Sequence, residues 1–232
     1  MDLSTQKKGK ILYLVFALLF CSILMSLVDS VIQPQYFIKS LIKIVLFLGA
    51  VLGYFFLLFK EDRTDFKKIF SPNKRDVQYS LPLGVLVYAV IVGGYFLLRN
   101  SFDFSGITEK LTADSGVNKD NFLFVSLYIS FVNSFLEELL FRAVGFSFLK
   151  KYTNRTFAYI FSALMFSLYH SGMTTGYFHF GVFALTLSAL FIAGLFFNYL
   201  NEKSGTVYAS WLVHAFANFG INTVGCILFG IL

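Results

Sequence analysis

The chain has 232 residues, of which 57% are hydrophobic and 14% are charged, with a mean hydropathy of +0.71. A soluble domain carries about 25% charged residues, so the composition excludes a soluble protein and predicts an all-α, polytopic helical bundle in a lipid bilayer. The net charge of +6 does not predict a nucleic-acid partner, because the distribution of the cations follows the positive-inside rule of membrane proteins.

Apolar runs of about 20 residues are long enough to cross a bilayer, and they predict seven to eight spans in a single membrane domain, residues 1–232. We expect the first three spans and their loops in residues 11–121, a core with the polar motifs in 122–219 and an apolar C-terminal segment in 220–232. The stretch 206–232 is expected to form either one kinked helix or two short ones that meet at Gly220. The other expected spans are 11–32, 37–59, 79–98, 122–149, 156–170 and 180–200.

The charges outside the apolar runs predict the orientation of the chain. Residues 60–76 are the most charged segment, and a break in any helix is expected at residues 71–73, which read S-P-N. With the N-terminus in the cytoplasm, thirteen of the 19 Lys and Arg residues lie in cytoplasmic segments and three lie in outer segments. This bias predicts a cytoplasmic N-terminus. We expect Asp29 to lie at the membrane interface, and the side chains of Lys39 and Lys43 to reach the interface from one end of the second span.

Two glutamates and one arginine lie in the middle of the run 122–149, within N-S-F-L-E-E-L-L-F-R. A charge near the centre of a membrane helix costs about 2.5–3.5 kcal/mol on insertion scales, so such residues usually have a function. Residues four apart share a helix face, which places Asn133 beside Glu137 and predicts a buried ion pair between Glu138 and Arg142. Glu137 then has no cation nearby in the sequence. An unpaired carboxylate in a dry site can exchange protons near neutral pH, so Glu137 is the candidate general base.

Two of the three histidines lie in apolar runs. His170 ends F-S-L-Y-H, and His214 lies in W-L-V-H-A-F-A-N-F with Asn218 four residues later on the same helix face. A single buried histidine is more often a hydrogen-bonded core residue than a catalyst. Two of them beside two glutamates and an asparagine make a site and a packing role equally plausible on spacing alone. His179 lies in a linker, and we expect no role for it.

The sequence lacks the residues of other intramembrane peptidases. No H-E-x-x-H is present for a zincin-type metal site. The dipeptide at residues 171–172, Ser-Gly, lacks the preceding glycine of a rhomboid-like G-x-S-G, and Asp29 is the single aspartate in an apolar run, so no aspartate pair forms.

Three short motifs follow one another in predicted spans. They are E-E-L-L-F-R at Glu137–Arg142, F-S-L-Y-H at Phe166–His170 and H-A-F-A-N at His214–Asn218. They resemble the motifs E-E-x-x-x-R, F-x-x-x-H and H-x-x-x-N of the type II CAAX prenyl endopeptidase family, also called the Abi or CPBP family. The resemblance covers about residues 122–219. It implies a helical intramembrane peptidase whose polar cavity opens toward the cytoplasm.

The resemblance also implies a role for each motif residue. Glu137 and His170 would activate a water molecule that attacks the scissile carbonyl. His214 and Asn218 would hold the developing oxyanion, which matters most in a dry site of low dielectric constant. The remaining motif residues, Glu138 and Arg142, would support the shape of the site.

Zinc is an alternative to this metal-free mechanism. Glu137, His170 and His214 would leave a zinc ion with an open fourth position, and the ion would then activate the water. No two histidines have the i, i+4 spacing of established zinc helices, so the metal-free version is favoured and no cofactor is expected.

The expected substrate is a membrane-associated peptide or protein, such as a bacteriocin or signalling-peptide precursor, in the membrane of a bacterial cell. One alternative is a non-proteolytic protein of the same family that confers bacteriocin self-immunity or regulates a partner by binding in the membrane. A further alternative is a small transporter, because intramembrane Glu and His residues also suit proton relays. No paired, interrupted hydrophobic segments predict inverted halves, so the transporter ranks last.

Overall fold

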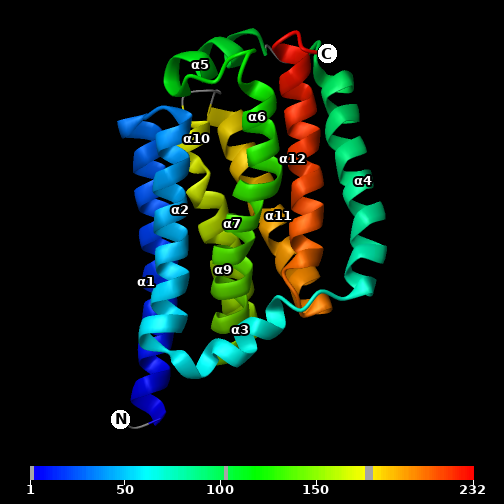
Figure 1. The fold of residues 1–232 in the computed structure, drawn as a ribbon. Coiled ribbons are helices and arrows are strands. Elements are labelled where there is room, and N and C mark those ends of the chain that lie inside the picture. The colour runs from blue at the N-terminus through cyan, green and yellow to red at the C-terminus, as the bar shows by residue number, and fades with distance from the viewer. Residues whose placement is uncertain (1–2, 102–103, 176–179) are drawn as a thin grey trace.

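The computed structural model describes residues 3–101, 104–175 and 180–232, and every regular element in these ranges is a helix. The long helices are α1 (Leu3–Leu27), α2 (Tyr36–Leu52), α4 (Lys74–Leu98), α11 (Phe180–Ser204) and α12 (Tyr208–Leu228), and the π-helical segments η1 (Val28–Ile32) and η2 (Gly53–Leu58) extend α1 and α2. The shorter helices are η3 (Lys60–Asp62), α3 (Arg63–Ile69), α5 (Ser105–Ser115), α9 (Arg155–Tyr169) and α10 (Ser171–Thr174). Helices α1 and α2 lie at one edge of the bundle, and α4 lies at the opposite edge beside α12 (Figure 1).

A continuous helical run, Phe122–Tyr152, passes through the middle of the bundle (Figure 1). The run consists of α6 (Phe122–Leu127), η4 (Tyr128–Asn133), α7 (Ser134–Glu138), η5 (Leu139–Phe146) and α8 (Ser147–Tyr152). Aromatic rings pack around its second half: the ring centroid of Phe141 lies 6.0 Å from that of Phe47 in α2 and 5.5 Å from that of Phe166 in α9. The centre of the core therefore lies between α2, the central run and α9.

Six helices in the described residues are long and apolar enough to cross a membrane: Ser4–Ile32, Tyr36–Leu58, Lys74–Leu98, Phe122–Tyr152, Phe180–Ser204 and Tyr208–Leu228. The structure therefore supports about six candidate spans, and the seven to eight expected from the sequence remain a prediction. The expected span 156–170 corresponds to α9, which has 15 residues and is not among the six. At 1.5 Å per residue it is about 22 Å long, shorter than a hydrocarbon core of about 30 Å.

Helix α12 decides between the two expectations for the C-terminal stretch. It is one helix that runs through Gly220 without a break. A Cβ atom on Gly220 would lie 3.1 Å from Ile91 Cβ in α4, so the glycine permits close packing of α4 against α12 instead of joining two short helices. The division of the chain at residues 121 and 219, and the cytoplasmic N-terminus, remain predictions.

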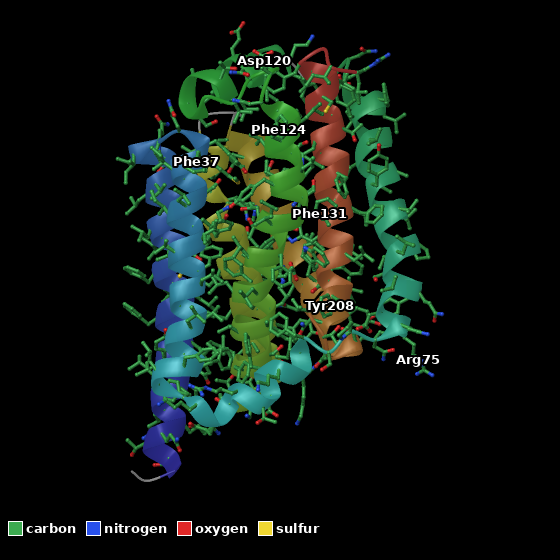
Figure 2. The ribbon with its side chains drawn as sticks, viewed as in Figure 1. Phe37, Arg75, Asp120, Phe124, Phe131 and Tyr208 are labelled. Atoms are coloured by element: carbon green, nitrogen blue, oxygen red, sulfur yellow. The ribbon has the colours of Figure 1, made fainter. Side chains whose placement is uncertain are left out.

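The outer surface of the bundle carries large apolar side chains. Phe37 and Phe124, for example, are 72% and 78% exposed (Figure 2). Monomeric soluble proteins rarely expose wide apolar patches, and side chains of this kind suit contact with lipid. Together with the apolar helices, this surface indicates a multi-pass membrane protein.

Charged side chains gather where the N-terminal helix meets the segment 60–76. The predicted break at residues 71–73 is confirmed, because α3 ends at Ile69 and α4 begins at Lys74, with the Asn73 side chain capping α4. Asp62 is buried and pairs with residues from three parts of the chain. The Asp62 cluster consists of Lys10, Tyr54, Asp62, Lys151 and Tyr152. It fastens α1, η2 and α8 to the segment that connects α2 with α4.

Two further contacts fix α1 within the bundle. Asp29 is buried, and its Oδ1 atom lies 2.5 Å from Lys39 Nζ; its expected position at the membrane interface remains a prediction. A Cβ atom on Gly172 of α10 would lie 2.4 Å from the backbone oxygen of Ser26 in α1. Only glycine permits this approach, which places the end of α9 and α10 directly against α1.

Candidate active site

The two adjacent glutamates lie at the midpoint of the central run, between the π-helical segments η4 and η5. Glu137 is 1% exposed, and Glu138 and Arg142 are fully buried. Single wide turns of this kind inside helices are frequent at functional sites. The sequence expectation that these charges lie inside the bundle is confirmed.

The structure brings Glu137 together with both buried histidines, although they belong to three different helices. The Oε2 atom of Glu137 lies 3.7 Å from Nε2 of His170 at the end of α9 and 3.6 Å from Nε2 of His214 in α12. These distances exceed a direct hydrogen bond but suit a bridging water molecule. One carboxylate oxygen and two imidazole nitrogens therefore face the same point.

Each histidine is oriented through its other ring nitrogen. Nδ1 of His170 lies 2.7 Å from the carbonyl oxygen of Phe166, and Nδ1 of His214 lies 2.9 Å from Oε1 of Glu138. A carbonyl oxygen only accepts, so the hydrogen of a neutral His170 lies on Nδ1 and its Nε2 lone pair points toward Glu137. Glu138 orients His214 in the same way: its Oε1 atom contacts Nδ1, and Nε2 faces Glu137.

The second oxygen of Glu137 is held by three side chains. Oε1 accepts hydrogen bonds from Asn133 Nδ2 at 2.7 Å and from the Tyr169 hydroxyl at 3.0 Å, and Lys43 Nζ lies 3.5 Å away. Lys43 is 4% exposed. The expectations that Lys43 reaches the interface and that Glu137 is an unpaired carboxylate were therefore wrong, because α2 packs against the central run.

Oε2 of Glu137, in contrast, is buried and has no hydrogen-bond partner among the described residues. The two oxygens of one carboxylate thus differ: Oε1 has two hydrogen-bond donors and a cation, whereas Oε2 faces two imidazole nitrogens. A buried acceptor without a donor is costly, and Oε2 of Glu137 can accept a hydrogen bond from a bound water molecule or ligand.

The predicted ion pair between Glu138 and Arg142 is confirmed, with Nη1 3.3 Å from Oε1. The guanidinium carbon also lies 4.1 Å from the ring centroid of Phe166 and 5.0 Å from that of Phe197, which adds cation–π attraction. Glu138 Oε1 therefore bridges Arg142 and His214, and the fixed arginine holds the glutamate that orients the histidine.

Asn218 lies on α12 one turn after His214, as the spacing predicts, but its amide nitrogen donates to the backbone oxygen of Ile129 at 3.2 Å. The other amide hydrogen is available for a ligand, and its role at an oxyanion remains a prediction.

His179 lies outside the described residues. In the described part of the chain, no group of three His, Cys, Asp or Glu side chains is placed to hold a metal ion.

Sequence reasoning missed Lys43 and Tyr169 and gave Asn133 only a position. Asn133 was placed on the Glu137 face by its i, i+4 spacing, and the hydrogen bond between them follows. A lysine inside an apolar run is itself a signal, but nothing in the sequence pairs it with a glutamate 94 positions later. Tyr169 has no signal beyond its place next to His170.

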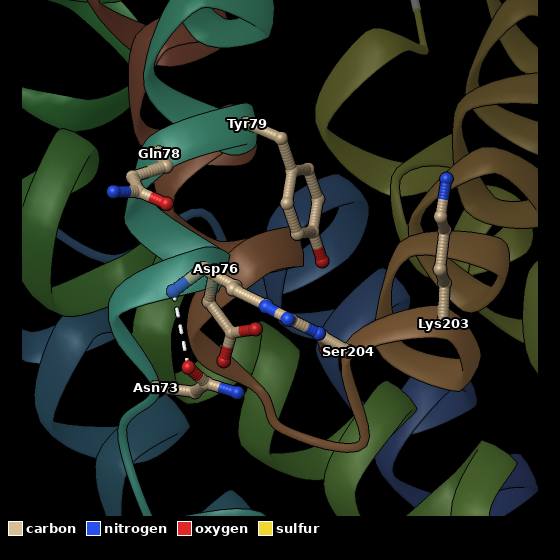
Figure 3. A pocket seen from close by; sticks show the side chains of 7 residues that line it. Asn73, Asp76, Gln78, Tyr79, Lys203 and Ser204 are labelled. Atoms are coloured by element: carbon tan, nitrogen blue, oxygen red, sulfur yellow. Dashed lines mark hydrogen bonds between the residues drawn. The ribbon is translucent and has the colours of Figure 1, made fainter.

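A separate cavity of about 420 Å³ lies between the start of α4 and the end of α11 (Figure 3). None of the motif residues lines it, and its polar groups are largely engaged: Asn73 Oδ1 accepts from the backbone N–H of Arg75, and Asp76 Oδ2 accepts from Thr206. The cavity therefore belongs to the end of the bundle and not to the glutamate–histidine site. Its lining residues are Asn73, Arg75, Asp76, Gln78, Tyr79, Lys203 and Ser204.

Comparison with known proteins identifies a family domain in the second half of the chain. Residues 119–220 match the family model described as type II CAAX prenyl endopeptidase Rce1-like. No curated protein and no solved structure matches the chain. The matched residues contain the three motifs that hold Glu137, His170 and His214. The chain thus carries, over residues 119–220, an Rce1-like type II CAAX prenyl endopeptidase domain.

Proposed function

We propose that the chain is an intramembrane endopeptidase in which Glu137 is the general base. Membership in the family suggests a protease that acts on a protein substrate. One observation carries the proposal: Oε2 of Glu137 is buried without a donor and faces Nε2 of both His170 and His214 at 3.6–3.7 Å. A water molecule bound at this point would contact the base and both imidazoles.

The reaction begins when Oε2 of Glu137 takes one proton from this water, while His170 Nε2 accepts a hydrogen bond from the second hydrogen, which stays on the oxygen and orients it for attack. The water oxygen then forms a bond with the carbonyl carbon of the scissile peptide. General base catalysis of this kind contributes about 10²–10⁴-fold in rate. Glu137 afterwards gives its proton to the departing amide nitrogen as the carbon–nitrogen bond breaks.

His214 and Asn218 stabilise the negative charge on the former carbonyl oxygen. In its protonated form, His214 donates from Nε2 while Glu138 accepts from Nδ1 at 2.9 Å. Asn218 donates the amide hydrogen that Ile129 does not use. Removing one such donor in other hydrolases costs about 10²–10³-fold in turnover. Arg142 keeps Glu138 in place through the 3.3 Å ion pair.

The proposed substrate is a membrane-associated peptide or protein whose scissile bond reaches the level of Glu137, midway along the central run. The dry site requires an extended segment, because a helical segment has its carbonyl oxygens bonded within the helix. The cation bias of the loops supports a cytoplasmic N-terminus.

The test replaces the chromosomal copy with Glu137→Gln and compares membrane and secreted peptides by mass spectrometry with those of the wild type. Glu137→Gln keeps the size of the side chain and removes its basicity. We expect a precursor to accumulate and its fragment to disappear, which would also identify the substrate.

The matched control is Glu109→Gln, because Glu109 is exposed on α5. It should leave the peptides unchanged. Peptides identical to the wild type in Glu137→Gln cells, with the variant present in the membrane at normal level, would refute proteolysis and favour a binding role.

A further inference from the structure

Lys43 makes the least expected contribution to the site. It lies on α2, outside residues 119–220 that match the family model. Its Nζ atom lies 2.5 Å from Asn133 Oδ1, 3.5 Å from Glu137 Oε1 and 5.0 Å from the ring centroid of Tyr169. All of these partners belong to the central run or to α9, so Lys43 crosses from its own helix into the glutamate–histidine site.

The contacts of Lys43 fix the orientation of the Asn133 amide. An ammonium group only donates hydrogen bonds, so the atom of Asn133 that faces Lys43 is the oxygen. The amide nitrogen then points to Oε1 of Glu137, where it donates at 2.7 Å. Lys43 therefore acts on Glu137 twice, by its own charge and through the amide that it orients.

The neighbouring lysine shows that this arrangement is specific. Lys39 lies one helical turn before Lys43, and its Nζ is 2.5 Å from Oδ1 of Asp29. Each lysine of α2 thus has its own carboxylate, and the charge of Lys39 is already balanced. Lys43 is the lysine assigned to Glu137.

We propose that Lys43 is a positioning residue that holds Oε1 of Glu137, so that Oε2 is the oxygen presented to water and to the two histidines. This inference rests on the proposed function. A carboxylate that loses this anchor can rotate, and a misplacement of about 1 Å at a reacting group costs about 100-fold in rate. Helix α2 is then part of the catalytic apparatus.

The experiment uses the peptide comparison described above, with four variants. Lys43→Met removes the charge and the donor, Lys43→Gln keeps a donor for Asn133 without the charge, and Lys43→Arg keeps both. Lys39→Met is the matched control, because it removes a lysine from the same helix that pairs with Asp29 instead. The ratio of precursor to product is measured beside Glu137→Gln, together with the amount of each variant in the membrane.

We expect the precursor to accumulate in Lys43→Met and Lys43→Gln cells as it does in Glu137→Gln cells, with about 100-fold less product formed. Lys43→Arg should restore processing, and Lys39→Met should process normally. Normal processing in Lys43→Gln or Lys43→Met cells, while Glu137→Gln is inactive, would overturn the role of Lys43 and leave the proposed function intact.

Three other outcomes also decide against the proposal. Equal loss in Lys39→Met cells at normal protein level would mean that α2 needs its lysines for structure. Absence of both Lys43→Gln and Lys43→Met from the membrane, with Lys43→Arg present, would likewise assign a structural role. Wild-type peptides in Glu137→Gln cells would remove the proposed function itself, and with it this inference.

Discussion

Removing Arg142 should destabilise the protein strongly, and removing the charge of Glu138 as well should recover much of the lost stability. Arg142 is fully buried, 3.3 Å from Glu138 and close to the rings of Phe166 and Phe197. Arg142→Met keeps an unbranched apolar side chain of similar length and leaves Glu138 without its arginine. Loss of one partner from a buried ion pair costs about 3–5 kcal/mol, because the other charge stays buried.

The expected shift follows from the size of the chain. A change of 1 kcal/mol moves the unfolding midpoint of a domain of this size by about 2–4 °C, so Arg142→Met should lower the midpoint by roughly 6–20 °C. Glu138→Gln should also lower it, because Arg142 then keeps only the aromatic rings. The double variant has neither charge, and its midpoint should fall by much less than the sum of the falls in the two single variants.

The two cysteines of the chain provide the assay. Cys21 and Cys226 are free and only 1% and 7% exposed, so a thiol-reactive fluorophore reports the unfolding of detergent-solubilised protein on heating. The assay is run on the wild type, both single variants and the double variant. Additive midpoint shifts in the double variant, or a shift below about 2 °C for Arg142→Met, would refute a coupled buried pair.

Two other predictions concern the contacts that fasten the bundle. Burial would raise the pKa of Asp62, but hydrogen bonds from Lys151, the tyrosines and Lys10 outweigh it and hold the pKa below 3.8. The folded-state pKa is therefore below the unfolded one, so this stabilisation is present above about pH 4 and is lost as the pH falls through the folded value. The midpoint of the wild type should fall between pH 5 and pH 3, and Asp62→Asn should show a smaller fall; equal slopes would contradict this account. Gly172→Ala should lower the midpoint, because its Cβ atom would lie 2.4 Å from the backbone oxygen of Ser26, whereas Gly49→Ala has nothing within 4 Å and should not lower it.

Local spacing predicted the parts of the site that lie on one helix. Residues four apart share a face, which gave the Glu138–Arg142 ion pair and the position of Asn133 beside Glu137. The resemblance of the three motifs to the family implied that His170 and His214 join the glutamate. Composition alone predicted an all-α membrane protein.

Contacts between distant helices could not be predicted in the same way. Lys43 joins the site only because α2 packs against the central run with one particular face, and helix rotation about its own axis is not encoded in an apolar run of nearly uniform hydrophobicity. The number of spans was predicted from run length, and α9, with 15 residues, is too short to be among the six candidate spans. The hydrogen bond of Asn218 to Ile129 depends on the close approach of α12 to η4.

The π-helical segments on either side of the glutamates change the direction in which side chains point around the axis of the central helix. A π-helical turn holds one residue more than an α-helical turn, and an α-helix rotates by about 100° per residue. Segments η4 and η5 therefore rotate the side chains before and after residues 134–138 about the helix axis, relative to where a regular α-helix would place them. Deleting one residue from either segment would turn the glutamates away from the histidines by about a quarter of a full rotation or leave the flanking apolar faces misaligned. The same helix thus keeps two packing surfaces and the face that carries Glu137 in register by varying its pitch.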